Sequence, residues 1–514
     1  MSYQFNRSTN NQLGTNATSA GGFLNSSDNL SGARSTGYSL GGHILYRHKF
    51  DLPGETFSLD VGTTVSPKDK NGDLTSATTS TSTRFTNQQS QSPINGVSLT
   101  SRIVYTNPVA VNNLVQISYA PSFTHSTSDA RTYDLDSLTN TYTTLDKPLS
   151  NSYVDTYISH TAGLAWLYRA KGLNMMAGMS YQLSTLDGEK TYPTDATVNR
   201  SFRAFLPSVT MNYTPEAGTN LRMFYRGTPQ APSINQLQDV VDNTNPLLLT
   251  TGNPGLAQSY SHTMVARYSI TNPVRSLSRF FLLAFTYTRD YIGNSVRTLG
   301  NDSTLTGGIH GTRGAQLSDP TNLDGYWNAR GFATFGLPFT LISSNLSFNT
   351  SLNFTRTPGL VQGASAISTT TVASQGLVVA SNISEDVDFN VTYTGNYTFG
   401  RNTLQPSQNS NYYSHTAGVM LNLTFWDGFV IRNDLNHAFS NGLSAGYNTN
   451  ALLWNASVSK KFLADLRGEI RLTVTDILEQ NKSTNRTITE TYIEDSISSV
   501  LPRYAMLTAS YTFR

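Results

Sequence analysis

The chain has 514 residues, of which 13% are charged, about half the share found in soluble globular proteins, and its net charge is +2. It is rich in aromatic residues, with 27 Tyr and 24 Phe. This composition excludes an intrinsically disordered chain, a long helical protein and a basic nucleic-acid binder. The lack of Cys excludes a disulfide scaffold and a Cys-ligated metal site, and no run of about 18 apolar residues could form a transmembrane helix.

Along the chain, short connections rich in turn residues alternate with long polar stretches. The short connections are 51–54, 170–172, 215–218, 336–338, 426–428 and 464–468. The long polar stretches are 66–95, 125–151, 227–257, 298–321 and 480–501. A strand meander with one tight rim and one looped rim gives this pattern. It predicts about 20 strands, each near the 9–11 residues that a tilted membrane strand needs.

The clearest strand pattern covers residues 387–399. Its odd positions are apolar or aromatic, apart from Gly395, and its even positions are Asp, Asn or Thr. Because successive side chains of a strand point to opposite faces, such a segment has one apolar and one polar face. The same alternation recurs in the segments 412–425, 429–439, 452–459, 469–474 and 507–513.

Two architectures could use these strands. A soluble sandwich, solenoid or propeller would bury the apolar face, whereas a transmembrane barrel would turn it to lipid and the polar face to a lumen. The polar faces carry Asn, Thr, Ser and some charges, the apolar faces carry few charges, and the apolar runs often end in aromatic residues such as Trp426 and Phe439. No fixed repeat period supports a solenoid or propeller. We therefore expect an all-β fold, a large antiparallel transmembrane β-barrel with long extracellular loops and short periplasmic turns.

One motif links the chain to a known family. The element Gly252-Asn253-Pro254-Gly255-Leu256 resembles the GNP-x-L signature of TonB-dependent receptors, although that family usually continues with Lys-Pro-Glu where this chain has Ala257-Gln258-Ser259. The C-terminal part resembles the outer-membrane β-barrel family of Bacteroidetes-type TonB-dependent receptors. The segments that carry this likeness, which is strongest from residue 232 onward, are 425–429, 453–456, 460–462, 476–481, 492–495 and 501–504.

The resemblance implies a 22-stranded barrel in the outer membrane of a Gram-negative bacterium. Full family members begin with a signal peptide, a segment that docks the energising inner-membrane complex, and a plug. Because this chain begins Met1-Ser2-Tyr3 without these features, we expect residues 1–514 to be the barrel domain alone, lacking the plug and possibly the first strands. Since the final residue is Arg514, the aromatic signal for the barrel-assembly machinery would be Tyr511 and Phe513.

Charged residues on the polar faces are the candidates for contact with a solute. On the predicted register, Arg222, Arg226, Arg432, Asp434, Glu469 and Arg471 point into the lumen. Salt bridges between neighbouring strands are the alternative explanation. We expect the signature residues Gly252, Asn253, Pro254 and Leu256 to be structural or adjacent to a ligand.

Three Ser-His-Thr triplets, at 159–161, 261–263 and 414–416, each open a predicted strand after a polar loop. A ligand-binding role is possible for them, but we interpret them as a recurring element of the outer rim.

No sequence feature indicates catalysis, a metal site or a cofactor, since the chain has no HExxH or P-loop motif and its eight His are scattered. We expect the barrel domain of a TonB-dependent receptor-like transporter for an iron chelate, glycan, peptide or similar nutrient. Its expected partners are outer-membrane lipid, the barrel-assembly machinery, the energy-transducing complex and the nutrient, with no nucleic acid. The alternative is a passive wide pore or a structural or surface-attachment barrel.

Overall fold

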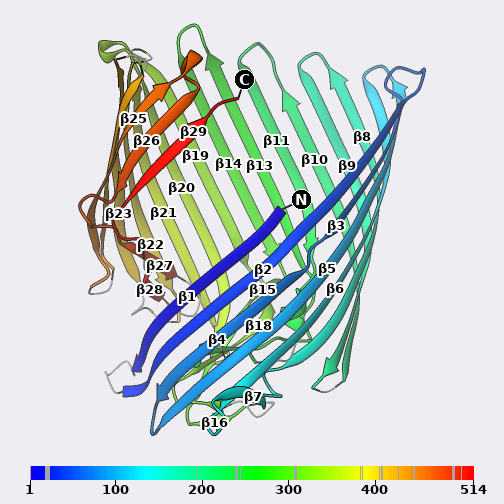
Figure 1. Ribbon diagram of the computed structural model, residues 1–514. Helices are drawn as coiled ribbons and strands as arrows, with labels where there is room; N and C mark the ends of the chain where they lie inside the picture. Colours follow the sequence, from blue (N-terminus) through cyan, green and yellow to red (C-terminus); the bar gives the residue numbers. More distant parts are fainter. Residues whose placement is uncertain are drawn as a thin grey trace.

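The computed structural model describes almost the whole chain as one large curved sheet (Figure 1). The described residues are 2–17, 23–193, 195–237, 241–243, 245–305, 310–381, 384, 386–404, 406, 409–426, 428–443, 446–488, 493–498 and 500–513. Asp427 of an expected turn, Tyr492 of the family resemblance and the final Arg514 lie outside these residues.

The barrel wall is antiparallel throughout, and each strand pairs with its neighbours along the chain. β3 and β4 pair with the same two strands, β2 and β5, and so occupy one position of the wall. Within the described residues the wall therefore has 20 strand positions, in line with the predicted number of about 20. In order they are β1 (Ser2–Ala17), β2 (Phe23–Lys49), β3 (Thr56–Val65) with β4 (Lys68–Thr79), β5 (Thr83–Ala110), β6 (Asn113–Asp136), β8 (Asn151–Ala170), β9 (Leu173–Tyr192), β10 (Ala196–Tyr213), β11 (Thr219–Gln230), β13 (Ser259–Asn272), β14 (Leu277–Arg289), β19 (Tyr326–Phe339), β20 (Ser344–Val361), β21 (Ala364–Ser381), β22 (Val387–Asn402), β23 (Ser410–Phe425), β24 (Phe429–Asn441), β25 (Thr449–Phe462), β26 (Gly468–Thr475) and β29 (Tyr504–Tyr511).

The remaining elements are short and lie in the connections. At the looped rim they are β7 (Thr141–Leu145), α1 (Ile234–Leu237), β12 (Leu248–Thr250), β15 (Tyr291–Thr298), β16 (Ser303–Thr304), β17 (His310–Gly311), β18 (Gln316–Leu323), β27 (Ser483–Ile488) and β28 (Ile493–Ser498). Two 3-10 turns, Thr340–Ile342 and Ala464–Leu466, close short connections. Among the described residues, no helix is long and apolar enough to cross a membrane.

The two faces of the wall differ as the alternation predicted. On β22 the side chains of Val391, Tyr393 and Phe399 are exposed on the outside, whereas Thr398 and Asn402 are buried on the inside. Outward Leu283 of β14 is 67% exposed although it is apolar. An apolar outer surface is stable only against lipid, so the sequence's low charge reflects the face that borders the membrane.

Strand length is where the sequence-based expectation was wrong. β5 has 28 residues and β2 has 27, far more than a membrane span needs. The stretches 66–95 and 125–151, expected to be loops, are largely the outer parts of β4, β5 and β6. Beyond the membrane both faces of a strand meet water, so the apolar–polar alternation that identifies a strand disappears.

One expected turn was also wrong. Residues 336–338 belong to β19, and the chain reverses at 340–343 instead. Pro338 pairs with Asn345 next to the last residue of its strand, where the missing N–H disturbs the ladder little.

The sheet has two edges at the seam between the chain's ends. β1 pairs with β2 and β29 pairs with β26, and no pairing joins β1 to β29 among the residues described above. The 22 strand positions implied by the family resemblance are therefore not reached.

Candidate ligand-binding site

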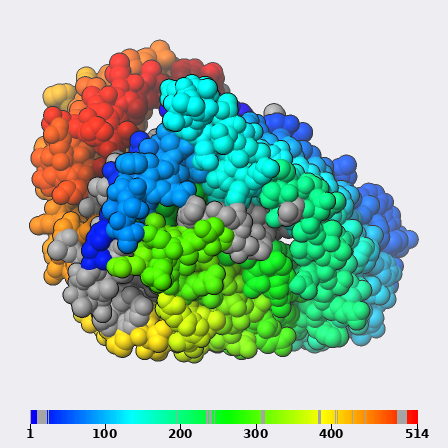
Figure 2. Space-filling view, turned by 90° about the horizontal axis from the view of Figure 1, so that it is seen from below, coloured from blue at the N-terminus to red at the C-terminus, as the bar shows by residue number. Residues whose placement is uncertain are grey.

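Two inserted segments lie across the mouth at the looped rim, coloured green in the view from below (Figure 2). The first connects β11 to β13 and contains α1 and β12; the second connects β14 to β19 and contains β15 and β18. β12 pairs in parallel with β18, β18 pairs with β15, and β15 pairs with wall strand β20 at Ser295 and Val296. The two insertions thus form a small sheet that is joined to the wall.

Two apolar clusters hold the insertions in place, the first by joining them to each other and to the connection before β8, the second by joining the first insertion to the wall. One contains Val241, Leu249 and Leu317 with Leu149 packed against them. The other contains Leu237 of α1 and Leu256 with Leu186 of β9. Complete burial of a Leu side chain stabilises by about 1.5–3 kcal/mol, so these few residues suffice to order the insertions.

The signature residues form the joint between α1 and β18. Gly252 and Leu256 are buried, and Asn253 connects three segments: its N–H donates to the Gln236 carbonyl at 2.6 Å, its Nδ2 donates to the Pro320 carbonyl at 3.0 Å, and its Oδ1 accepts from the Gly255 N–H at 2.8 Å. The Pro254 carbonyl accepts from Arg200 of the wall at 2.6 Å. This geometry favours the structural explanation of the signature over contact with a ligand.

A polar recess of about 590 Å³ lies between the first insertion and the inner wall. Its floor is the part of the inner wall where small residues of β2, β4, β5 and β6 face inward and leave space. They are Ser31, Ala33, Gly72, Ser90, Ser92, Ser128, Ala130 and Thr132. The insertion contributes Val241, Asp242, Asn243, Thr250 and Thr251, and the other charged residues of the lining are Lys70 and Asp73.

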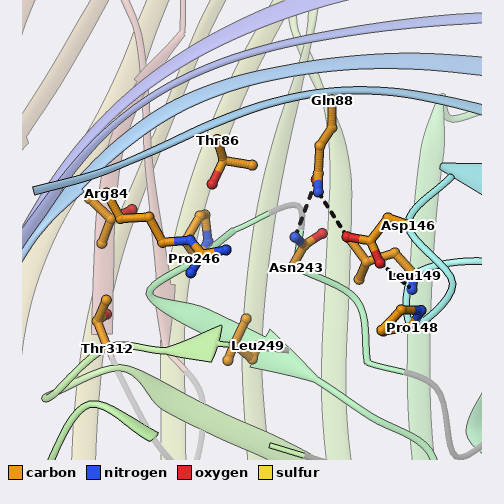
Figure 3. Close-up of a pocket in the computed structure, with 11 residues that line it drawn as sticks. Arg84, Thr86, Gln88, Asp146, Pro148, Leu149, Asn243, Pro246, Leu249 and Thr312 are labelled. Carbon is orange, nitrogen blue, oxygen red and sulfur yellow. Dashed lines mark hydrogen bonds between the residues drawn. The ribbon is translucent and has the colours of Figure 1, made fainter. Parts of the chain in front are cut away.

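Gln88 of β5 lines both this recess and a smaller neighbouring cavity of about 70 Å³ (Figure 3). Its Nε2 donates to Asp134 Oδ1 at 2.9 Å and to Asp146 Oδ2 at 3.3 Å, and its Oε1 accepts from Asn243 Nδ2 at 3.3 Å. Burial, with a further contribution from nearby Asp134, raises the pKa of the Asp146 carboxyl, while the Leu149 N–H acts in the opposite direction. One buried amide therefore links the wall to both neighbouring loops.

The six sequence-predicted lumen charges lie elsewhere on the inner face, in two separate sectors. Arg222 and Arg226 of β11 alternate with the outward Leu221, Met223 and Tyr225, as predicted, and Arg222 Nε donates to Asn212 Oδ1 at 3.3 Å. None of the six lines the recess.

The second sector is a small charged cavity of about 70 Å³ on β24, β25 and β26. Arg432, Glu469 and Arg471 line it together with Lys461. Arg471 pairs with Glu469 at 2.7 Å within one strand, so this pair is not the salt bridge between neighbouring strands that the alternative explanation required. Asp434 lies outside this cavity and accepts from Asn436 Nδ2 at 2.6 Å.

The histidines of the Ser-His-Thr triplets face outward from the wall, whereas the flanking Ser and Thr residues face inward. The triplet 159–161 is well inside β8, which begins at Asn151, so the expectation that it opens a strand was wrong. Its His160 and the other two triplet histidines contact tyrosines instead of lining a cavity.

Residues Gln88 and Asn243 and the small-residue floor were missed by sequence reasoning. They come from distant parts of the chain, and each lies in an Asn-, Ser- and Thr-rich stretch without a distinguishing pattern. Among the described residues, no group of three or more His, Asp or Glu could hold a metal ion.

The wall and its folded-in mouth define a large outer-membrane β-barrel. Residues 48–511 match the profile of the Outer membrane protein beta-barrel family, and the chain belongs to this family. The expected outer-membrane β-barrel family, fold and outer-membrane location are thereby confirmed. A comparison with curated protein sequences finds no match.

Several solved structures are similar to this chain, each at 10% sequence identity. The ferric citrate transporter FecA in its unliganded form matches with a TM-score of 0.45 over 100% of this chain and 76% of its own. The hemophore receptor HasR of Serratia marcescens, in complex with HasA and heme, matches at 0.44 over 95% and 72%, and the copper transporter OprC at 0.41 over 99% and 81%.

Proposed function

We propose that residues 1–514 are the barrel domain of a TonB-dependent receptor-like transporter that takes up a nutrient such as an iron chelate, a glycan or a peptide. The observation that carries this proposal is the polar recess of about 590 Å³ under the first insertion. Its size falls in the range of about 300–1,000 Å³ typical of small-molecule sites. A passive wide pore has no need of an ordered insertion with its own buried clusters across the mouth.

The partners follow from this role. The nutrient would enter between the insertion and the small-residue floor, and the inward Arg222, Arg226, Arg432, Asp434, Glu469 and Arg471 would line its further path. The barrel-assembly machinery would recognise Tyr511 and Phe513 at the end of β29. Energy would reach the barrel from the inner membrane through a docking segment and plug of the kind that full receptors carry.

The recess can be tested by filling it. Ser90 faces inward on the floor, whereas its neighbour Gln89 is not among the lining residues and donates to Asp73 of the adjacent strand at 3.0 Å. We expect Ser90→Trp to abolish binding of the nutrient in calorimetric titrations with iron chelates, oligosaccharides and peptides, and Gln89→Trp to leave it unchanged.

Conductance separates a transporter from a pore. In planar bilayers, we expect the purified protein to conduct poorly and a variant that lacks residues 232–257 to conduct strongly. A large, steady conductance of the unaltered protein, together with no binding of any of these solutes, would establish the passive pore instead.

A further inference from the structure

The small charged cavity on β24, β25 and β26 carries more positive than negative charge. Its lining contains three cationic side chains and a single carboxylate, namely Arg432, Lys461, Arg471 and Glu469. The rest of the lining is polar apart from one apolar side chain, and consists of Asn422, Thr424, Ser457, Ser459 and Val430. The cavity therefore offers an excess of positive charge together with hydroxyl and amide groups.

The wall itself satisfies the single carboxylate. Glu469 Oε1 accepts from Arg471 Nε at 3.1 Å and from Arg471 Nη2 at 2.7 Å. The hydroxyl of Ser459, which is only 4% exposed, donates to the same carboxylate. Glu469 and Arg471 therefore neutralise each other, and the excess positive charge belongs to Arg432 and Lys461.

Arg432 and Lys461 have no partner within the part of the chain that the structure describes. Neither side chain forms a hydrogen bond or an ion pair there. Lys461 interacts electrostatically with Glu469, but the two groups are too far apart for an ion pair. Both cations are thus available to an anion that enters the cavity.

Other acidic side chains of this face do not supply the missing charge. Asp388 of β22 is opposite Asn422, and Asp434 lies two residues from Arg432, but neither aspartate lines the cavity. Asp434 accepts from Asn436 Nδ2 at 2.6 Å instead. Among the described residues, the two cations therefore lack a counter-charge.

Arg432 and Lys461 reach the cavity from neighbouring strands. Arg432 on β24 is directly opposite Ser457 on β25, and Lys461 follows Ser457 by four residues. Four residues of a strand span about 13 Å, so the two long side chains must extend toward each other to line one cavity. Like charges brought together in this way repel, and an anion between them would remove the repulsion. Because Lys461 comes three residues before the short turn that begins at Ala464, the cavity lies at the tight-rim end of the lumen.

The size and charge of the cavity suit one phosphate group. Its volume of about 70 Å³ is several times the roughly 10–15 Å³ that one water molecule requires. A phosphate group carries a charge of about −1.5 to −2 at pH 7, which matches the two uncompensated cations, whereas a carboxylate carries a single negative charge. Arginine binds phosphate oxygens through its planar fork and lysine binds them as a point charge.

We propose that this cavity binds one phosphate group, held by Arg432, Lys461 and the hydroxyl of Ser457, at the tight-rim end of the lumen. The group is either free inorganic phosphate or the phosphate of an organic solute that reaches the cavity through the lumen. The site is separate from the recess, with which it shares no lining residue.

Titration calorimetry on the full chain, refolded in detergent at low ionic strength, tests the proposal. We expect saturable binding of inorganic phosphate and at least tenfold weaker binding of acetate, which has one charge. Between about pH 7.5 and about pH 5.5 the affinity for phosphate should fall severalfold, because its second pKa is about 6 and it loses a charge. Sulfate keeps both of its charges over this range, so its affinity should stay the same.

Glucose 6-phosphate distinguishes the two sources of the phosphate group. If its binding is at least as tight as that of inorganic phosphate, the site accepts the phosphate of an organic solute. If its binding is at least tenfold weaker, the site is specific for free phosphate. Glucose, which has the sugar ring but no phosphate, should not bind.

Four variants locate the site. Arg432→Gln and Lys461→Gln should each weaken phosphate binding by at least tenfold. Glu469→Gln removes the only carboxylate of the lining and should strengthen phosphate binding severalfold, which a mere loss of structure would not do. Arg222→Gln, the matched control, removes an inward arginine of another sector and should leave the binding unchanged. The heat-modifiable shift on gels would show that each variant is folded.

Two results would overturn the proposal. One is the absence of saturable phosphate binding by the unaltered protein. The other is an equal loss of affinity in Arg432→Gln and Arg222→Gln, which would show an adventitious ion only, held by the general charge of the lumen. Because these titrations involve no transport, their outcome does not depend on whether the proposed nutrient uptake is correct.

Discussion

Within the membrane, each outward residue of the wall borders lipid, while its neighbours in the strand border the lumen. On β14, Leu283 faces outward and Leu282 faces inward. We expect Leu283→Arg to cost about 2–4 kcal/mol of folding free energy, because it places a charge in the apolar band. Leu282→Arg, its matched control, should cost clearly less because it meets the wet interior. Urea titrations in vesicles would measure both, and equal costs would contradict the assigned register.

Gln88 concentrates three hydrogen bonds in one buried side chain. Gln88→Ala would leave Asp134, Asp146 and Asn243 without this partner, and an unsatisfied buried polar group costs about 1–3 kcal/mol. We expect hydrogen exchange at residues 241–250 to accelerate by about tenfold or more. Gln89→Ala should leave these amides unchanged, since the Gln89 side chain donates to Asp73 in an exposed hydrogen bond. Unaltered exchange in both variants would show that the Gln88 side chain does not hold this insertion in place.

Residues of the site differ in how far the sequence reveals them. The direction of Arg222 and Arg226 could be predicted because apolar residues alternate with them, and the direction of a strand's side chains is fixed by the backbone. The recess could not be predicted in the same way. Its floor combines strands β2, β4, β5 and β6, and Asn243 reaches it from more than 100 residues further along the chain.

At the scale of elements, the insertions are ordered by packing, whereas the wall is ordered by its hydrogen-bond ladder. Leu249 of β12 is 1% exposed and contacts Val241 and Leu317. Leu249→Ala should cost about 2–5 kcal/mol, because it leaves a cavity in a small cluster. That cost should fall on the insertion alone. We expect faster proteolysis within 232–257 and an unchanged heat-modifiable midpoint of the wall, and a lowered midpoint would show that the two unfold together.

A second tether joins the β14–β19 insertion to the tip of the β4–β5 hairpin. Asp302 accepts from the Arg313 N–H at 2.6 Å, from Ser80 at 2.9 Å and from Thr81 at 2.9 Å. The Arg313 N–H, followed by the two hydroxyls, lowers the pKa of Asp302, although its partial burial acts in the opposite direction. The folded state therefore favours the ionised carboxylate.

The sign of the pH dependence follows from this lowered pKa. The stabilising contribution is present above the ordinary pKa of Asp, about 3.9, and is lost as the pH falls through the lower folded value. We expect the Arg313 amide to be equally protected from exchange at pH 7 and pH 5, after correction for intrinsic rates, and to lose protection below about pH 4. Asp302→Asn should show weaker protection at every pH. An unchanged acid response in this variant would assign the effect to another group.

The elements were predictable where the membrane constrains them. Lipid on one side and water on the other impose the alternation of residues 387–399, and β22 follows it. Where water bathes both faces, as in the outer parts of β5 and β6, nothing in the residue pattern separates strand from loop. For the same reason the residue pattern does not reveal β12 and β18. These two strands pair with each other and form only because their partners are already held by the wall.

At the scale of the whole molecule, the barrel has two unlike rims, and the chain must cross the membrane in a single orientation. The tight rim carries turns such as 273–276, and the other rim carries β7 and the insertions. Outer-membrane barrels carry short turns on the periplasmic side and longer loops on the extracellular side. We therefore expect the looped rim to face the cell exterior and the tight rim to face the periplasm.

Single cysteines at the two rims test this orientation, because the chain has no Cys of its own. Leu138, next to β7, and Val274, in a tight turn, are both 94% exposed, so their substitutions differ in location and not in accessibility. On intact cells, a membrane-impermeant maleimide should label Leu138→Cys and leave Val274→Cys unlabelled. After the outer membrane is permeabilised, both should react to the same extent. Labelling of Val274→Cys on intact cells would reverse the orientation and, with it, place the recess on the periplasmic side.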